Sequence, residues 1–214
     1  MKINNILFDL DGTLTDPKVG ITKSAAYALS RFGINKDPDE LLHVIGPPLA
    51  FSFKKYGFSD ADCDLLIKYY REYFSVTGKF ENELYKYTFK MLDHLKASGK
   101  KLYIATSKPE VFAIDIAKHF GFFDYFEKIH GIALGEERIE KDVVIKRLLL
   151  EHNLSPDECL MVGDRCFDIY GAHRCGVKAV GVLFGYGSEQ EHIEANADYI
   201  VDTNRDLYEF MKGL

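Results

Sequence analysis

Short apolar runs alternate with helical patterns along most of this chain, and that alternation limits the folds open to it. Three runs are rich in β-forming residues and end in polar or small residues, at 6–10, 101–107 and 159–164. Two more follow at 177–185 and 197–201. Helical patterns occupy the segments between them, at 84–98, 109–120, 142–153 and 167–175. This repetition predicts an α/β fold with a doubly wound, parallel, Rossmann-like sheet.

The segment between the first two strands is too long to be a simple crossover. It spans about ninety residues, whereas a strand–helix–strand unit needs only a few tens. Residues 17–79 are helical by pattern, with a first helix ending at Gly33 and three more expected at 38–45, 49–56 and 61–77. We therefore expect a four-helix cap domain at 17–79, inserted into a core domain made of residues 1–16 and 80–214.

The composition argues against several classes of protein. The chain of 214 residues has a formal net charge of −6 and no block of Lys or Arg, so we do not expect it to bind duplex nucleic acid. No secretion leader and no apolar run of about 18 residues is visible, so no membrane partner is expected. The four cysteines form no CxxC pair and indicate a cytoplasmic protein with free thiols. Without heptads, we expect a monomer or a weak dimer.

Carboxylates, hydroxyls and lysines stand where three of the expected strands end. They are Asp9 and Asp11 after the first strand, Thr106, Ser107 and Lys108 after the second, Asp164 and Asp168 after the third, and Lys141 at the start of the preceding helix. Each residue alone has a structural explanation as a helix cap, a turn residue or a surface lysine. Ligands of open α/β sheets bind beyond the carboxyl ends of the strands, however, and independent caps need not gather at one edge. The conjunction favours a common site.

Paired carboxylates at the end of an apolar strand suit phosphoryl transfer at a metal ion. Clustered carboxylates repel one another unless a cation neutralises them, and Mg²⁺ prefers such hard oxygen ligands. One carboxylate can attack phosphorus, and a second, two residues on, can protonate the leaving oxygen. Gly12 lets the chain turn sharply beside the phosphate. Hydroxyl, backbone N–H and lysine groups would hold the remaining phosphate oxygens.

The motifs DLDGT (9–13), IATSKP (104–109) and GDRCFD (163–168), with Lys141 between the last two, resemble those of the haloacid dehalogenase-like phosphohydrolases. The resemblance covers essentially the whole chain and implies that the inserted helices are the small helical cap of that family. It implies the following roles: Asp9 as nucleophile and metal ligand, Asp11 as general acid/base and backbone metal ligand, Thr106 at the phosphate, Lys141 between phosphate and nucleophile, and Asp164 with Asp168 at Mg²⁺, Asp168 directly or through water. Gly12, Thr13 and Ser107 are expected beside the substrate. The loop before Lys141 lacks the proline typical of the family, which leaves Arg138 as an alternative.

The same motifs narrow the reaction. Asp11 favours phosphoester chemistry, since similar dehalogenases lack an acid there. Sugar phosphomutases share the motif, but similar mutases carry a cap-loop arginine that is absent from HVIGPPLAFSF (43–53). The whole pattern resembles the phosphoglycolate-phosphatase and 5′-nucleotidase branch. We expect hydrolysis of a small phosphomonoester, either a nucleoside 5′-monophosphate or 2-phosphoglycolate, through an aspartyl phosphate; a phosphomutase or a non-catalytic metabolite-binding protein is the alternative.

The cap loop is expected to shape the leaving-group pocket through Gly46 and Pro47. Its simpler explanation is a turn between helices, with Pro48 opening the next one. Aromatic residues follow at helical spacing and are interpreted either as a stacking surface for a base or as cap core: Phe51, Phe53 and Tyr56.

Overall fold

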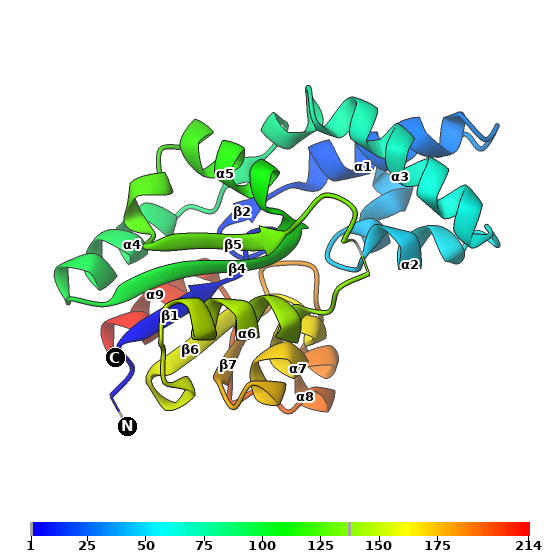
Figure 1. Cartoon of the computed structure of the whole chain (residues 1–214). Helices are drawn as coiled ribbons and strands as arrows, with labels where there is room; N and C mark the ends of the chain where they lie inside the picture. The colour runs from blue at the N-terminus through cyan, green and yellow to red at the C-terminus, as the bar shows by residue number, and fades with distance from the viewer. Residues whose placement is uncertain (1, 137) are drawn as a thin grey trace.

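The computed structural model describes residues 2–136 and 138–214, and its centre is a parallel sheet of six strands (Figure 1). The strands lie in the order β5-β4-β1-β6-β7-β8, and every neighbouring pair is parallel. Their bounds are β1 (Asn5–Phe8), β4 (Lys101–Pro109), β5 (Lys128–Ile132), β6 (Cys159–Gly163), β7 (Lys178–Val182) and β8 (Tyr199–Val201). The predicted doubly wound α/β fold is confirmed.

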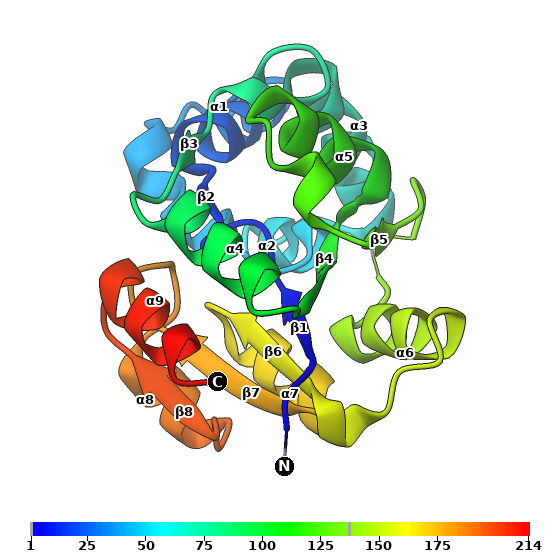
Figure 2. The same cartoon turned by 90° about the vertical axis from the view of Figure 1, so that its left-hand side faces the viewer.

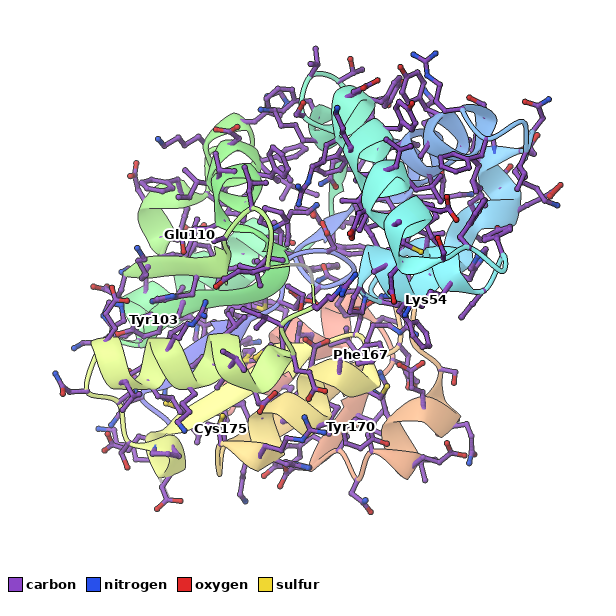
Figure 3. All side chains as sticks on the ribbon, turned by 45° about the vertical axis from the view of Figure 1, so that its right-hand side comes forward. Lys54, Tyr103, Glu110, Phe167, Tyr170 and Cys175 are labelled. Atoms are coloured by element: carbon purple, nitrogen blue, oxygen red, sulfur yellow. The ribbon has the colours of Figure 1, made fainter. Side chains whose placement is uncertain are left out.

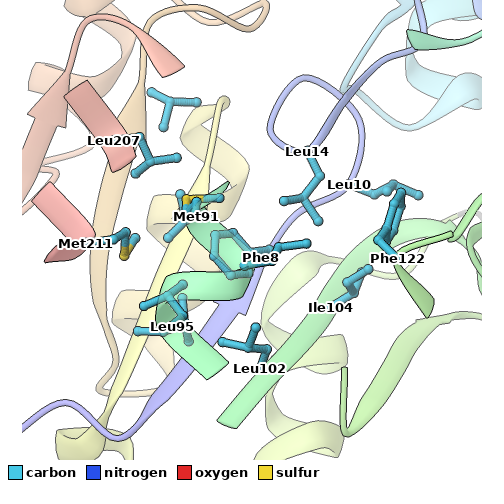
Figure 4. Close-up of a cluster of buried hydrophobic side chains, with 14 of the residues drawn as sticks. Phe8, Leu10, Leu14, Met91, Leu95, Leu102, Ile104, Phe122, Leu207 and Met211 are labelled. Carbon is cyan, nitrogen blue, oxygen red and sulfur yellow. The ribbon is translucent and has the colours of Figure 1, made fainter. Parts of the chain in front are cut away.

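Helices cover both faces of the sheet (Figure 2). One face packs against α4 (Thr88–Ala97), α5 (Glu110–His119) and α9 (Asn204–Lys212). The other packs chiefly against α6 (Lys141–Glu151) and α7 (Cys166–Arg174), with α8 (Glu189–Glu194) alongside α7. Figure 4 shows the first of these two cores, where Phe8 packs among side chains of α4, β4 and α9.

Strand β1 is apolar because it is central and covered on both sides. Ile6 and Phe8 belong to the core beneath α4 and α9, while Leu7 belongs to the core beneath α6 and α7. All three side chains are fully buried. Burial on both faces gives the near-continuous apolar run expected of a parallel strand. The chain can become polar only where the strand ends, at Asp9.

The segment after β1 leaves the core and returns to it through a short antiparallel ribbon. β2 (Thr15–Asp16) pairs with β3 (Glu83–Leu84) to form this ribbon. Between them lie α1 (Lys18–Ser30), the 3-10 helices η1 (Pro38–Val44) and η2 (Gly78–Phe80), α2 (Leu49–Lys54) and α3 (Asp60–Phe74). Their buried side chains form a third hydrophobic cluster, to which the core contributes Phe112.

Three elements of the sheet layers were not predicted. Strand β5 has the sequence KIHGI, whose histidine and glycine hide the β pattern. Helices α8 and α9 begin after Ser188 and Thr203, whose side chains cap them, but both helices are short. The second predicted cap helix is a 3-10 helix rather than an α-helix. Within the described residues, no helix combines the length and apolar character needed to cross a membrane.

Candidate active site

The carboxyl ends of β1 and β6 bring Asp9, Asp164 and Asp168 together. Oxygen atoms of these three carboxylates all lie within 4.8 Å of one another. Asp9 N donates to Val162 O at 2.8 Å, which extends the pairing of β1 with β6 by one residue and fixes the position of Asp9. Asp164 and Asp168 are 99% buried. Three carboxylates are thus held at one edge of the sheet, as the sequence predicts.

Lys141 joins two of these carboxylates. As the first residue of α6, it places its Nζ 2.9 Å from Asp9 Oδ1 and 2.7 Å from Asp168 Oδ1. Burial alone would lower the pKa of Lys141, but the carboxylates of Asp168 and Asp9 together raise it above its ordinary value. The lysine is therefore a fixed cation beside Asp9. Arg138, the alternative left open by the sequence, is exposed and faces Asp60 and Asp64 of α3 instead.

Asp168 holds this lysine in place. Its Oδ1 pairs with Lys141, and its Oδ2 accepts a hydrogen bond from Arg165 N at 3.1 Å. Gly163 permits the arrangement, because a Cβ there would lie 2.2 Å from Asp168 Cγ. Both Asp168 oxygens thus have protein partners, one of which is Lys141.

The carboxylate cluster fits a divalent cation. Asp164 Oδ1 is buried and has no hydrogen-bond partner among the described residues. Burial and the charges of Asp168 and Asp9 raise the pKa of Asp164 well above its ordinary value. Hard oxygen donors carrying excess negative charge are the set that Mg²⁺ binds. The residues expected to hold Mg²⁺ are thus chemically suited to it.

Backbone from two loops closes over Asp164. Gly12 has φ +79°, and a Cβ there would lie 2.1 Å from Asp164 Oδ2. On the other side, Tyr186 N donates to Asp164 Oδ2 at 2.8 Å, and a Cβ on Gly185 would lie 2.4 Å from Asp164 Cβ. The tyrosine hydroxyl donates to Asp16 Oδ1 in β2. The GYG segment (185–187) therefore links the carboxylate cluster to β2 of the antiparallel ribbon.

Asp11 lies in a different environment from Asp9. Lys108 Nζ contacts both of its carboxylate oxygens, at 2.8 and 2.7 Å, and lies 4.7 Å from the centroid of the Phe74 ring. Burial raises the pKa of Asp11 above its ordinary value, although Lys108 opposes that rise. A carboxyl with a raised pKa beside a cation is suited to exchanging a proton. The sequence analysis places Lys108 at a strand end but predicts no function for it.

The remaining predicted residues divide into two groups. Thr106 is buried, and its Oγ1 accepts a hydrogen bond from Lys108 N at 3.2 Å, which shapes the strand end. Thr106 and Ser107 line a cavity together with Gly46 and Pro47 of the cap loop. Gly12 and Thr13 do not line that cavity in the described part of the chain. Gly12 supports Asp164 as described above, and Thr13 is buried with no hydrogen-bond partner for its Oγ1 among the described residues.

Two adjoining cavities lie between core and cap. The inner one, of about 100 Å³, is lined by Asp9, Asp11 and the strand end 106–109, and on the cap side by Tyr70, Arg71 and Phe74. The outer one, of about 490 Å³, includes Lys141 and shares Gly46, Pro48, Ser107 and Ile139 with the first.

The outer cavity carries aromatic rings and cations on its walls. Phe51 from α2 and Phe167 and Tyr170 from α7 are its rings, and Lys54 and Arg174 are among its cations. Figure 3 shows Lys54 at the end of the cap nearest the core, with Phe167 and Tyr170 on the core below it. Of the three cap aromatics singled out in the sequence, Phe51 is exposed here, whereas Phe53 is fully buried in the cap cluster. Tyr56 packs on the same cluster beside His43.

Arg165 connects the core to the cap loop. Its Nη1 donates to Ile45 O at 2.8 Å, and its Nε pairs with Glu191 Oε1 at 2.9 Å. A Cβ on Gly46 would lie 2.7 Å from Arg165 Nη1, so the loop can approach this closely only with glycine there. The sequence showed Arg165 inside the GDRCFD motif but gave no signal that it reaches the cap.

Comparison with known proteins identifies the family of this chain. The model of the haloacid dehalogenase-like hydrolase family matches residues 6–182. A 5′-nucleotidase of Pseudomonas aeruginosa is 47% identical over 194 residues, covering 89% of this chain and 87% of the relative. A phosphoglycolate phosphatase of Vibrio parahaemolyticus is 27% identical over 219 residues, covering 97% of this chain and 95% of the relative.

A solved structure extends the likeness to the whole fold. The crystal structure of a predicted phosphatase from Clostridium acetobutylicum matches with a TM-score of 0.96 and 40% identity, covering all of both chains. The chain therefore belongs to the haloacid dehalogenase-like hydrolase family and is a phosphatase of that family.

Proposed function

We propose that the protein is a Mg²⁺-dependent phosphatase that hydrolyses a small phosphomonoester through a phosphorylated Asp9. The observation that carries this proposal is the placement of Asp9: its carboxylate lies against Lys141, within the carboxylate cluster, and on the wall of the inner cavity. A carboxylate so placed can attack a phosphorus atom that enters from the cap side.

The proposed reaction has two half-reactions with one acid/base group. Asp11 donates a proton to the leaving oxygen while Asp9 attacks, and it then removes a proton from the water that cleaves the aspartyl phosphate. Its raised pKa keeps a proton available for the first half-reaction. Its ionised form, stabilised by Lys108, serves the second.

Two lysines serve different parts of the transferring group. Lys141 lies 2.9 Å from the Asp9 carboxylate and balances charge on the phosphoryl oxygens nearest to it. Lys108 offers a second cation on the Asp11 side, and Thr106 and Ser107 offer hydroxyls to the same oxygens. A magnesium ion held by Asp9 and Asp164, with the Asp11 carbonyl and with Asp168 contributing directly or through water, would neutralise the charge of nucleophile and phosphate.

The outer cavity supports a nucleoside 5′-monophosphate as substrate. The inner cavity, of about 100 Å³, has room for a phosphoryl group and a few further atoms. A base and sugar would extend into the outer cavity, past Gly46 and Pro48, and meet the rings of Phe51 and Phe167. Aromatic side chains stack on any base and so suit a nucleotidase of broad base preference. The alternative, 2-phosphoglycolate, needs only the inner cavity, where Arg71 offers a cation.

The cap is proposed to regulate entry of water. We take residues 17–79 as the cap domain and residues 1–16 and 80–214 as the core, joined by the β2–β3 ribbon. Closure during the first half-reaction would exclude water, and opening would admit it for the second. We further propose a cytoplasmic monomer or weak dimer, in keeping with its four free cysteines.

The test is phosphate release from nucleoside 5′-monophosphates, 2-phosphoglycolate, sugar phosphates and pyrophosphate, each with Mg²⁺ and with EDTA. We expect release that depends on metal and is highest for nucleotides. Phe51→Ala and Phe167→Ala should each lower kcat/KM for nucleotides about tenfold and leave 2-phosphoglycolate unchanged. No release from any compound by a folded, metal-binding protein would contradict the proposal, and a requirement for a bisphosphate activator would indicate a phosphomutase.

A further inference from the structure

A second group of metal-ligating side chains lies away from the carboxylate cluster. It consists of His130 on edge strand β5 and Glu151 and His152 at the end of α6. One ligand atom from each residue lies within 4.8 Å of the other two. Lys141 and His152 stand at opposite ends of α6, which is about 16 Å long at 1.5 Å per residue. The group is therefore separate from the proposed catalytic centre.

The fold fixes the two histidines on the same side of the sheet. His130 pairs with Ala105, which packs beneath α6, so the imidazole lies on the face that α6 covers. His152 directly follows α6, and its ring lies 5.1 Å from the ring of Tyr103. The two imidazole rings are 6.0 Å apart and nearly perpendicular. Figure 3 labels Tyr103 in this region, together with Glu110, which accepts a hydrogen bond from Gly131 N.

The ring nitrogens lack the hydrogen bonds that buried imidazoles normally make. His130 is 93% buried, and its Nε2 has no hydrogen-bond partner among the described residues, although it lies 3.1 Å from Glu151 Oε2. The atoms are close but not aligned for a hydrogen bond. His152 Nε2 is likewise buried without such a partner and lies 4.0 Å from Glu151 Oε1. Buried polar atoms are usually satisfied, so two unsatisfied nitrogens facing one carboxylate require an explanation.

The arrangement matches the donors of a transition-metal site. Imidazole nitrogen and carboxylate oxygen suit Zn²⁺ and similar divalent ions, whereas Mg²⁺ prefers oxygen alone. In a tetrahedral site with bonds of about 2.1 Å, the ligand atoms are about 3.4 Å apart. His130 Nε2 lies 3.1 Å from Glu151 Oε2, close to this value, and one ligand atom from each of the three residues lies within 4.8 Å of the other two.

Charge and access also favour the site. Burial lowers the pKa of His130, although Glu151 and Glu110 oppose this, so the ring is neutral near pH 7 and can bind metal. The Glu151 side chain is 53% exposed and provides an entry path.

We propose that His130, Glu151 and His152 bind one Zn²⁺ or similar divalent transition-metal ion, with one coordination position left to solvent. Binding would tie edge strand β5 to the end of α6. The site is structural and does not depend on the proposed function of the carboxylate cluster.

The test uses the full-length protein with saturating Mg²⁺, so that the carboxylate cluster is occupied. Zn²⁺ is titrated by calorimetry, and Co²⁺ is added separately to record its visible absorption spectrum. We expect one equivalent of Zn²⁺, a Co²⁺ spectrum without a thiolate charge-transfer band, and a higher midpoint of thermal unfolding with Zn²⁺. Glu151→Gln and His152→Ala should each weaken Zn²⁺ binding at least about tenfold.

The matched control is His173→Ala, which removes a partly exposed histidine that also faces a carboxylate, Asp198, but belongs to no group of three metal-ligating side chains among the described residues. It should bind Zn²⁺ as the unchanged protein does. Glu151 and His152 are surface residues at a helix end, so their variants should fold; His130→Gln, which is buried, serves only as a supplement. No bound Zn²⁺, unchanged affinity in Glu151→Gln and His152→Ala, or a thiolate band with Co²⁺ would each overturn the proposal.

Discussion

At the scale of single residues, the charged side chains of the site form two groups, each centred on one lysine. Asp9 shares Lys141 with Asp168, and Asp11 is paired with Lys108. The two carboxylates are only two positions apart in the chain, yet each faces its own lysine. That separation supports the different roles proposed for them, Asp9 as the nucleophile and Asp11 as the group that exchanges a proton.

Replacing Asp9 by Asn should abolish turnover while the protein remains folded. The amide keeps the size of the side chain but cannot attack phosphorus, so kcat should fall about 10⁴-fold or more. The measurement is phosphate release under saturating substrate, together with the unfolding midpoint. A variant that retains near-normal kcat would show that Asp9 is not the nucleophile.

Replacing Lys108 by Met should move the pH profile of kcat/KM. Lys108 opposes the rise that burial imposes on the pKa of Asp11, so its removal raises that pKa further. Asp11 then stays protonated to higher pH. The alkaline limb of the kcat/KM profile therefore moves to higher pH, while the maximal rate falls. Lys79→Met, which removes a cation paired with Asp115, is the control and should leave the limb in place. If the alkaline limb does not move in Lys108→Met, Asp11 is not the group whose deprotonation sets that limb.

At the scale of elements, the cap depends on close backbone approach. Gly20 of α1 lies so near η2 that a Cβ on it would be 1.8 Å from Gly78 O. The contact lies just beyond the β2–β3 ribbon, where the chain enters and leaves the cap. Both glycines are therefore required for the two ends of the cap to pack together.

Replacing Gly20 by Ala should destabilise the cap. The added methyl must displace backbone rather than a flexible side chain, and overpacking of this kind costs about 1–3 kcal/mol. We expect a lower midpoint in thermal or urea unfolding, with loss of activity at temperatures where the unchanged enzyme still works. Val19→Ala, at an exposed position of the same helix, should have little effect. Equal stability of the two variants would contradict the close contact.

At the scale of the whole molecule, the proposed metal site would couple stability to metal binding through Asp164. Because its folded-state pKa is raised, folding favours its protonated form, and the associated stability is present at low pH and lost as pH rises through the folded pKa. Without metal, ionising this buried carboxyl therefore costs the folded state stability as the pH rises. A bound divalent cation removes that cost and adds its own binding free energy.

Replacing Asp164 by Asn should reverse the response of stability to Mg²⁺. Without metal, the variant should unfold at a higher temperature than the unchanged protein as the pH rises, since a buried carboxyl that is costly to ionise beside Asp168 and Asp9 is gone. With Mg²⁺, the unchanged protein should gain stability and the variant should gain little. Thermal unfolding with EDTA and with Mg²⁺ measures both effects. An equal shift by Mg²⁺ in both proteins would place the metal elsewhere.

Sequence and structure agree wherever one strong local pattern decided the outcome. Strand β1 and the residues after it were predictable, because a run buried on both faces has to end where its carboxylates begin. Strand β5 was not predictable, because its histidine and glycine interrupt the apolar pattern of a buried strand. These residues fit an edge strand that packs against α6. The spacing of the cap aromatics did not decide whether they stack on a base or form the cap core. The packing shows that Phe51 is exposed and Phe53 is buried.

The sequence by itself determined the alternation of strands and helices, the carboxylates at the strand ends and the lysine that opens α6. These follow from periodicity and from the topology of parallel sheets, which are local or nearly local properties. Only the tertiary structure decided that Lys108 pairs with Asp11, that Arg165 reaches the cap loop, that Tyr186 links Asp164 to Asp16 in β2 and that two histidines meet beside Glu151. Those contacts join residues distant in the chain, and their side-chain directions depend on packing that no local pattern encodes.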